Sequence, residues 1–293
     1  MIVLIQQIFN GIALGLVYAL VAVGYSLVFG ILRLINFSHG AVYAFGAHAA
    51  LFFVGLHFGP IPAIICAVAV TGILGVLIDR LTLAPLRKKK SVPIAALVTT
   101  LGISNIIQNM LVVIFGSQRK PFPDFFNLGM LTIGGIRMNS RQFVMFGVAL
   151  VLLLFLLLIV QKTKIGLAMR ATAQNIKAAS LMGINVNSII TLTFLMGGAS
   201  AAIAGGMVSG YYQVVYPGMG FMIGLKAFAA SVLGGIGSLP GALVGGLAVG
   251  VIESIAALYI GSNYRDSMAF IILIVVLIFR PAGIFGKNEV TKV

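Results

Sequence analysis

Three groups of polar residues stand out in this otherwise apolar sequence. The first is Asn36-Phe37-Ser38-His39-Gly40, inside a run of 45 uncharged residues. If this run lies in a membrane, a polar break in its helix persists only where protein or a water-filled cavity satisfies the backbone. A helix starting there would aim free N–H groups into such a cavity, so Asn36, Ser38, His39 and Gly40 form a candidate pathway. The alternative is a short cytoplasmic turn, with Ser38 as the N-cap of the next helix.

The second group is one basic and one acidic residue, Lys226 and Glu253, each within a long apolar stretch. Charges buried in such stretches are costly and are as a rule paired or functional. Each lies about five or six residues from the same side of the predicted membrane, so at about 1.5 Å per residue their depths nearly agree. We expect an intramembrane ion pair. The alternative, Glu253 as a proton-coupling carboxylate, calls for more intramembrane acids.

The third group lies in a long internal loop, residues 161–187. Asn175 can cap a short helix over residues 176–181, and Gly183 can end that helix with a positive φ. Such a helix, lying parallel to the membrane with a basic face, suits either the membrane surface or a soluble partner.

Signatures of enzymes and metal sites do not occur in the sequence. There is no His-Glu-x-x-His, no Gly-x-Ser-x-Gly and no phosphate-binding loop. His39, His48 and His57 are spaced nine apart, so neighbours point to opposite faces of a helix and a shared metal is not expected. The single cysteine, Cys66, excludes a disulfide framework and a cysteine-based metal site. We expect no enzyme activity and no cofactor or metal bound by this chain.

Composition places the chain in a lipid bilayer. Of its 293 residues, 60% are hydrophobic and 8% are charged, where about 25% charged is usual. So few charges cannot cover the surface of a soluble protein of this size. The net charge of +14 lacks the solvated basic face of a nucleic-acid-binding protein. We therefore expect no nucleic-acid partner and interpret the charge as a signal of membrane orientation.

The uncharged runs predict the elements that hold these groups. One crossing needs about 20 residues, so the longest runs contain more than one span or a buried break. We predict one all-α, polytopic transmembrane domain over residues 1–293, with eight or nine transmembrane helices and at least one broken or re-entrant helix. The count is open because segment 221–233 is short. The expected spans are 5–29, 41–56, 62–81, 94–115, 143–160, 188–211, 221–233, 240–259 and 267–279.

Basic residues orient the spans. The densest cluster, residues 87–90, is assigned to the cytoplasm, which also puts residues 161–187 inside and the N-terminus outside. With nine crossings, 13 lysines and arginines lie inside and 5 outside. With eight, the balance is 10 against 8, so the distribution favours nine. Glycines four residues apart, such as Gly11 with Gly15 and Gly246 with Gly250, predict close helix packing.

Several short motifs occur together along nearly the whole chain. They are Asn36-Phe37-Ser38-His39-Gly40 with Gly46-Ala47, Ala84-Pro85-Leu86-Arg87, Arg170-Ala171-Thr172-Ala173, Ala227-Phe228-Ala229, Gly234-Gly235-Ile236-Gly237-Ser238 with Gly241-Ala242, and Arg280-Pro281-Ala282-Gly283-Ile284-Phe285-Gly286. In this set the chain resembles the branched-chain amino acid ABC permease family, the LivH type. Lys177-Ala178-Ala179-x-x-x-Gly183 resembles the Glu-Ala-Ala-x-x-x-Gly loop that docks ABC importer permeases onto their ATPases, with Lys177 where glutamate is usual.

The resemblance implies a multi-pass permease of the bacterial inner membrane that imports leucine, isoleucine or valine. Its partners would be a homologous second permease, two cytoplasmic ATP-binding subunits that hold ATP and Mg, and a periplasmic substrate-binding protein. The ATPase-coupling loop, about 161–187, would act through Gly166, Arg170, Ala171, Lys177, Ala178, Ala179 and Gly183. Alternatives are a permease of the same family for urea, short amides or other amino acids and, from another class, an ion-coupled secondary transporter.

Overall fold

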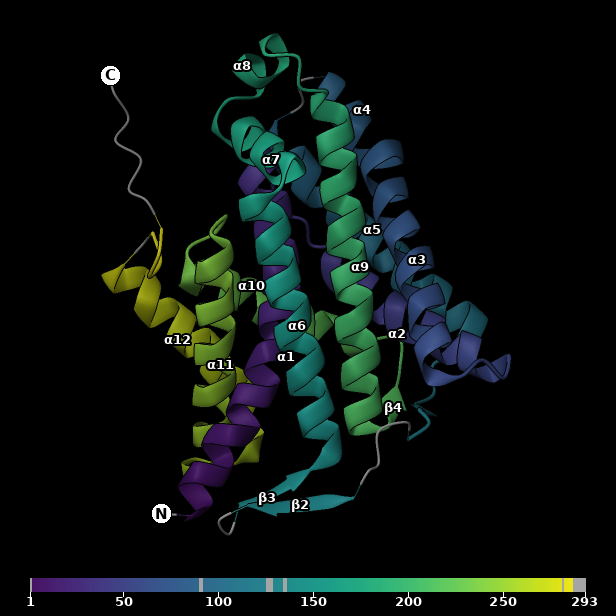
Figure 1. Ribbon diagram of the computed structural model, residues 1–293, viewed down its shortest axis with the longest axis vertical. Helices are drawn as coiled ribbons and strands as arrows, with labels where there is room; N and C mark the ends of the chain where they lie inside the picture. Colours follow the sequence, from purple (N-terminus) through teal and green to yellow (C-terminus); the bar gives the residue numbers. More distant parts are fainter. Residues whose placement is uncertain (1, 90–91, 125–128, 134–135, 281, 287–293) are drawn as a thin grey trace.

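The computed structural model describes residues 2–89, 92–124, 129–133, 136–280 and 282–286. Within these ranges the chain is a bundle of long helices (Figure 1). In chain order the elements are α1 (Ile2–Leu32), α2 (His39–Gly55), α3 (Pro60–Ile78), the π-helical turn η1 (Asp79–Leu83), α4 (Ala84–Lys88), α5 (Pro93–Phe115), β1 (Lys120–Pro121), β2 (Met130–Ile133), β3 (Ile136–Asn139), α6 (Ser140–Lys162), α7 (Lys164–Gln174), α8 (Ile176–Leu181), α9 (Val186–Tyr212), β4 (Val214–Val215), α10 (Met219–Gly234), α11 (Leu239–Tyr259), the 3₁₀ turn η2 (Ser262–Tyr264) and α12 (Arg265–Phe279).

The bundle has two distinct ends. The lower end in Figure 1 carries the start of α1, the β2–β3 hairpin and β4, and the upper end carries α4, α7 and α8. β2 pairs antiparallel with β3, and β1 pairs antiparallel with β4, with Lys120 opposite Val215. The all-α expectation therefore holds for the bundle itself, and two small two-stranded ribbons are added to it.

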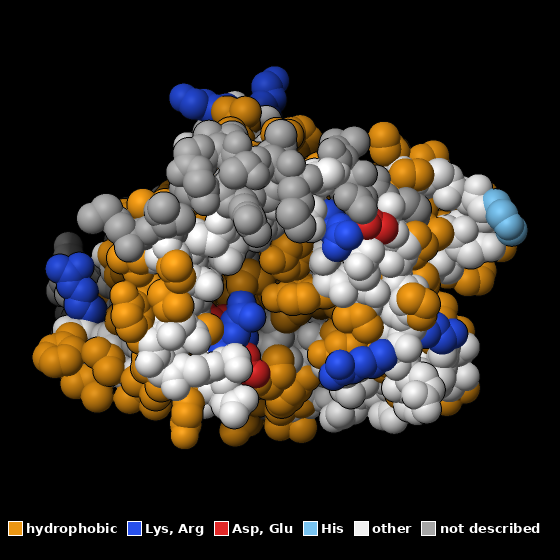
Figure 2. Space-filling model, turned by 90° about the horizontal axis from the view of Figure 1, so that it is seen from below, with side chains coloured by type: hydrophobic (Ala, Val, Ile, Leu, Met, Phe, Trp, Pro, Cys, Tyr) orange, Lys and Arg blue, Asp and Glu red, His pale blue; other side chains and the backbone are white. Residues whose placement is uncertain are grey.

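The described helices belong to a multi-pass membrane protein. Seven of them are long and apolar enough to cross a membrane, and α2 and α10 are apolar but shorter, at 17 and 16 residues. Seen from the lower end, hydrophobic side chains lie around much of the outline of the molecule, with lysine, arginine and some acidic side chains between them (Figure 2). On the sides of the helices, Val113 of α5 and Val151 of α6 are 85% and 68% exposed, and large apolar side chains this exposed are stable against lipid and not against water.

α1 lies at the centre of the bundle and packs antiparallel against α11 through glycines. A Cβ on Gly11 would lie 2.6 Å from the Cα of Val251, and a Cβ on Gly15 would lie 2.7 Å from the Cα of Leu247. Only glycine permits backbones to approach this closely. The packing predicted from the four-residue glycine spacing is confirmed at this seam.

A buried carboxylate joins three elements at the upper end. Asp79, in η1, accepts a hydrogen bond from Arg87 Nη1 at 2.6 Å and another from Thr191 Oγ1 at 3.1 Å. Arg87 belongs to α4 and Thr191 to α9, so one side chain ties α3, α4 and α9 together. Arg87 of the basic cluster therefore has a structural partner.

Candidate functional site

Two short helices, α2 and α10, begin inside the bundle. After α1 ends at Leu32, the chain folds back, and His39 at the start of α2 packs against Gly24. Gly24 precedes the end of α1 by eight residues, or about 12 Å. α10 begins after residues 213–218, which include β4 and enter the bundle from its lower end (Figure 1). Both helices are thus interrupted at depth, and one interruption comes from each end of the bundle.

The first turns of the two helices cross at glycines. A Cβ on Gly224 would lie 2.9 Å from the Cα of Gly40, and a Cβ on Gly220 would collide with the carbonyl group of Gly40. Any larger residue would force the helices apart. The crossing brings two positive helix ends into one region. Some of their first N–H groups are used locally, since His39 N donates to Asn36 O at 3.3 Å and Met219 N donates to Tyr216 O at 3.1 Å.

The break before α2 is held by its own side chains. Asn36 Oδ1 accepts hydrogen bonds from Ser38 N at 3.1 Å and Ser38 Oγ at 2.6 Å, and Phe37 N donates to Thr100 Oγ1 of α5 at 3.2 Å. Asn36 and Ser38 are buried. Asn36 thus satisfies one N–H group of the interrupted backbone and also borders a small cavity with Tyr25 and Ser231. That Asn36 and Ser38 face the pathway stays a prediction. Ser38 makes no side-chain cap to α2.

His39 is also buried and packs away from the crossing. Its ring lies edge-on to Tyr25, with ring centroids 4.8 Å apart, and its Nε2 has no hydrogen-bond partner within the described part of the chain. Of the four candidate pathway residues, Gly40 is the one that borders the cavity beside the crossing.

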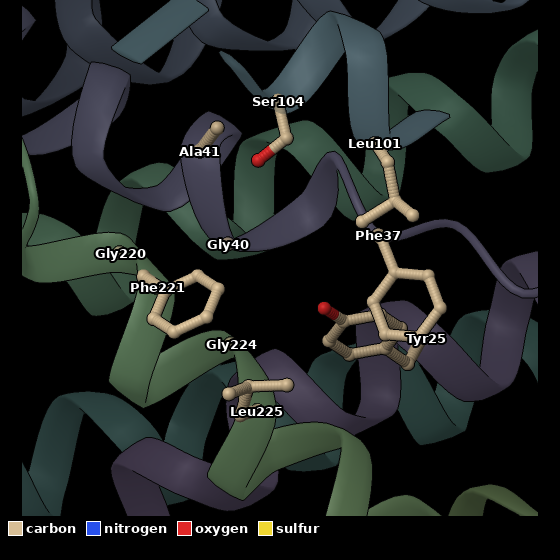
Figure 3. A pocket seen from close by; sticks show the side chains of 10 residues that line it. All are labelled: Tyr25, Phe37, Gly40, Ala41, Leu101, Ser104, Gly220, Phe221, Gly224 and Leu225. Atoms are coloured by element: carbon tan, nitrogen blue, oxygen red, sulfur yellow. The ribbon is translucent and has the colours of Figure 1, made fainter. Parts of the chain in front are cut away.

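That cavity measures about 30 Å³ and lies among α1, α2, α5 and α10. The hydroxyl groups of Tyr25 and Ser104 point into it (Figure 3). A space of this size holds about two water molecules, so an organic substrate enters only after the helices separate. The lining residues are Tyr25, Phe37, Gly40, Ala41, Leu101, Ser104, Gly220, Phe221, Gly224 and Leu225. Sequence reasoning found Gly40 and missed the hydroxyls, because an isolated Tyr or Ser in an apolar helix carries no spacing signal.

Lys226 and Glu253 are brought together. Lys226 Nζ lies 2.9 Å from Glu253 Oε1, and the Tyr18 hydroxyl donates to the same oxygen at 3.2 Å. The pair has two further members that sequence reasoning missed: Arg265 Nε lies 2.7 Å from Glu253 Oε1, and Lys226 Nζ lies 2.6 Å from Asp266 Oδ1. The cluster is neutral and joins α1, α10, α11 and α12. The available signal was the Arg265-Asp266 pair directly before the predicted span 267–279.

Residues 163–185 form two helices at the upper end (Figure 1). The predicted helix over residues 176–181 is confirmed as α8, Asn175 accepts its capping bond from Ala178 N at 3.0 Å, and Gly183 has a φ of +82°. α7 was not predicted. Its start was marked in the sequence by Thr163, which accepts from Gly166 N at 3.1 Å.

The residues of this segment divide into two groups. Gly166 packs against the carbonyl groups of Ile159 and Val160, and Arg170 Nη1 donates to the carbonyl of Val160, so both shape the α6–α7 turn. Ala179 is buried and Ala171 is half-buried. Lys177, Ala178 and Gly183 are exposed on the surface.

Two large apolar side chains stand at the tip of the same segment. Leu181 is 88% exposed and Met182 is 82% exposed. Adjacent apolar side chains this exposed, away from the long spans, are typical of a surface that a protein partner covers. Sequence reasoning missed them because exposure at a loop tip depends on tertiary position.

Comparison with known proteins identifies the family. The family described as branched-chain amino acid transport system / permease component matches residues 7–277. The chain belongs to this permease family. The permease is 39% identical to the high-affinity branched-chain amino acid transport system permease protein LivH of Escherichia coli (strain K12), covering 99% of this chain and 97% of LivH. It is 40% identical to BraD of Pseudomonas aeruginosa, covering 99% and 98%. PsaBC from Streptococcus pneumoniae in complex with Fab aligns with 96% of this chain and 92% of that chain, at a TM-score of 0.47 and 17% identity.

Motifs distant in the sequence of this permease meet around a second, open cavity. It has a volume of about 690 Å³ and lies where α1 and α10 end. Its lining includes residues of three of the family-like motifs, namely Ala173, Ile236-Gly237-Ser238 and Phe285-Gly286, together with Gln174, Phe29, Gly30 and Arg33. Unlike the cavity at the helix crossing, this one is large enough for an amino acid.

Proposed function

We propose that this permease subunit carries leucine, isoleucine and valine across the bacterial inner membrane as part of an ABC importer. Family membership and the names of relatives matched over 97% and 98% of their length support this proposal. The observation that carries it is the small cavity where α2 and α10 cross. That cavity combines two helix N-terminal ends, two hydroxyls and apolar side chains.

This lining suits an aliphatic amino acid. Positive helix ends favour the carboxylate of the zwitterion. Phe37, Leu101, Phe221 and Leu225 offer apolar surface to a branched side chain, which needs no hydrogen bond. Substrate passes when these walls separate, and leaves toward the larger cavity at the upper end.

The chain crosses the membrane nine times in this proposal, with α2 and α10 as interrupted spans. The N-terminus is then outside and the upper end is cytoplasmic. The position of α1's start at one end and of α4, α7 and α8 at the other supports this orientation (Figure 1), as does the basic cluster that begins at Arg87.

ATP hydrolysis on two separate subunits drives transport, so ATP and Mg are bound by those partners and not by this chain. One of the two ATPases docks against α7 and α8 of this chain, where Leu181 and Met182 are exposed near Lys177. A homologous permease and a periplasmic binding protein at the lower end complete the importer. Glu253 already faces Lys226 and Arg265, which argues against a proton-coupling carboxylate and hence against an ion-coupled carrier.

Uptake by the assembled transporter tests this function. The chain is reconstituted in liposomes with its permease, ATPase and binding-protein partners, and uptake of labelled leucine is compared with that of urea. We expect ATP-dependent leucine uptake. Urea uptake without leucine uptake would contradict the proposed substrate.

Gly183→Val tests the docking segment. A φ of +82° is sterically unfavourable for valine and is tolerated by asparagine. We therefore expect Gly183→Val to abolish substrate-stimulated ATPase activity, while Gly183→Asn, the matched control, retains most of it. Normal stimulation in Gly183→Val would remove the docking assignment.

A further inference from the structure

α5 carries four polar side chains at its middle, Ser104, Asn105, Gln108 and Asn109. α5 is one of the seven helices long and apolar enough to cross a membrane. At about 1.5 Å per residue, Asn105 lies roughly 15 to 18 Å from either end of the helix. Asn105 is therefore at mid-membrane depth, and Asn109 lies about 9 Å from the end of α5 at Phe115.

Two of the amides point away from the rest of the chain. Asn105 and Asn109 are exposed, whereas Ile107 and Leu111 are buried. Residues two apart differ by about 200° around a helix, so the two asparagines face opposite to the buried side. Asn109 Nδ2 donates to the backbone carbonyl of Asn105 at 2.8 Å. The carboxamide of Asn105 has no hydrogen-bond partner among the described residues.

Lipid offers no hydrogen-bond partner to the exposed amides of Asn105 and Asn109. A carboxamide that lacks a partner in hydrocarbon is strongly unfavourable, and polar side chains at this depth face water or other polar groups. The exposed amides therefore indicate a polar surface on the outside of α5.

The amides continue the lining of the cavity at the helix crossing. Ser104 and Leu101, on the same side of α5, border that cavity (Figure 3). One turn further along α5, the side chain of Gln108 lies beside Gly218, where a Cβ would be 3.6 Å from Gln108 Nε2. Gly218 directly precedes α10. The polar surface thus runs from the cavity past the start of α10.

We propose that Asn105, Gln108 and Asn109 form a polar wall of the substrate pathway on the lower-end side of the cavity, and that they hydrogen-bond the zwitterionic head of the passing amino acid. This inference rests on the proposed function. A carboxamide both donates and accepts hydrogen bonds, so it can contact an ammonium group and a carboxylate in turn. Because it is uncharged, it holds neither of them as tightly as a charged side chain would.

Cysteine modification in the assembled transporter tests this wall. In a Cys66→Ala background, Asn105→Cys and Asn109→Cys are treated with a membrane-impermeant, water-soluble thiosulfonate. The matched control is Val151→Cys, which is at the middle of α6 and 68% exposed on an apolar face. We expect both α5 cysteines to react at least tenfold faster than the control, and leucine with its binding protein to slow them. Rates as slow as the control would overturn the proposal, whether lipid or a neighbouring helix covers the face.

A transport measurement separates this inference from the proposed function. We expect Asn105→Leu to raise the KM for leucine uptake at least fivefold and Asn105→Gln to restore most of the affinity, at equal amounts of assembled transporter. If leucine uptake is normal and the α5 cysteines react as slowly as Val151→Cys, the polar wall is refuted and the proposed function is not. Fast α5 modification without any leucine uptake by the parent transporter would refute the substrate assignment and leave a water-lined face.

Discussion

Glu253→Gln should be among the most destabilising single changes of a charged residue in this permease. Glu253 is 1% exposed, and one of its oxygens faces Lys226 at 2.9 Å, Arg265 at 2.7 Å and the Tyr18 hydroxyl at 3.2 Å. Glutamine keeps the volume and removes the charge. Lys226 then keeps its contact with Asp266 at 2.6 Å, whereas Arg265 loses the carboxylate that it faces.

The size of the effect follows from burial. Removing one partner of a buried ion pair costs about 3–5 kcal/mol, or roughly 150-fold to 5,000-fold in the unfolding equilibrium. Asp266 has a side chain that is 54% exposed, so we expect Asp266→Asn to cost about 1 kcal/mol or less. Asp124→Asn, which breaks a partly exposed pair with Arg141, is the control for loss of a carboxylate and should cost equally little.

Pulse proteolysis across a series of denaturing-detergent concentrations measures the free energy of unfolding of each purified variant. A double-mutant cycle with Lys226→Met should show a coupling energy of about 0.5–3 kcal/mol. Exchanging Lys226 and Glu253 should recover little, because the new lysine would lie next to Arg265. Equal losses in Glu253→Gln and Asp266→Asn, or strictly additive losses in the cycle, would refute the argument from burial and contact.

Three further outcomes are expected. Gly40→Val should abolish leucine uptake, because its Cβ would collide with the Gly220 carbonyl, whereas Gly147→Val, in open space, should transport normally; equal uptake would contradict the crossing. Met182→Asp should lower substrate-stimulated ATPase activity several-fold in proteoliposomes without changing the amount of inserted permease, and unchanged stimulation would remove Met182 from the docking surface. Asp79→Asn should lower the free energy of unfolding by about 3 kcal/mol, because Asp79 is buried against an arginine; a loss below about 1 kcal/mol would show that this junction adds little.

Features that depend on neighbours in the sequence were predictable. An apolar segment of about 20 residues requires a membrane whatever it packs against, so the long helices lie where the hydropathy pattern expects them. The cap at Asn175 and the positive φ at Gly183 follow from local hydrogen bonding and sterics. α7 was missed because its start depends on one threonine cap, which many loops also contain.

Features that depend on distant segments were not predictable in the same way. In the break before α2, Phe37 N donates to Thr100 Oγ1 of α5, 63 residues away, and only the fold decided that contact. The outward direction of Asn105 was also not predictable, because it depends on which side of α5 packs against the bundle.

By itself, the sequence determined that this protein is a multi-pass helical membrane protein with a capped helix between two spans and a matched pair of intramembrane charges. These conclusions rest on hydration and on hydrogen bonds between near neighbours, which need no tertiary contact. The tertiary structure decided that α2 and α10 meet at Gly40 and Gly220, and that Arg265 and Asp266 complete the charge cluster. Those contacts join residues far apart in the chain, so they exist only once the helices have packed.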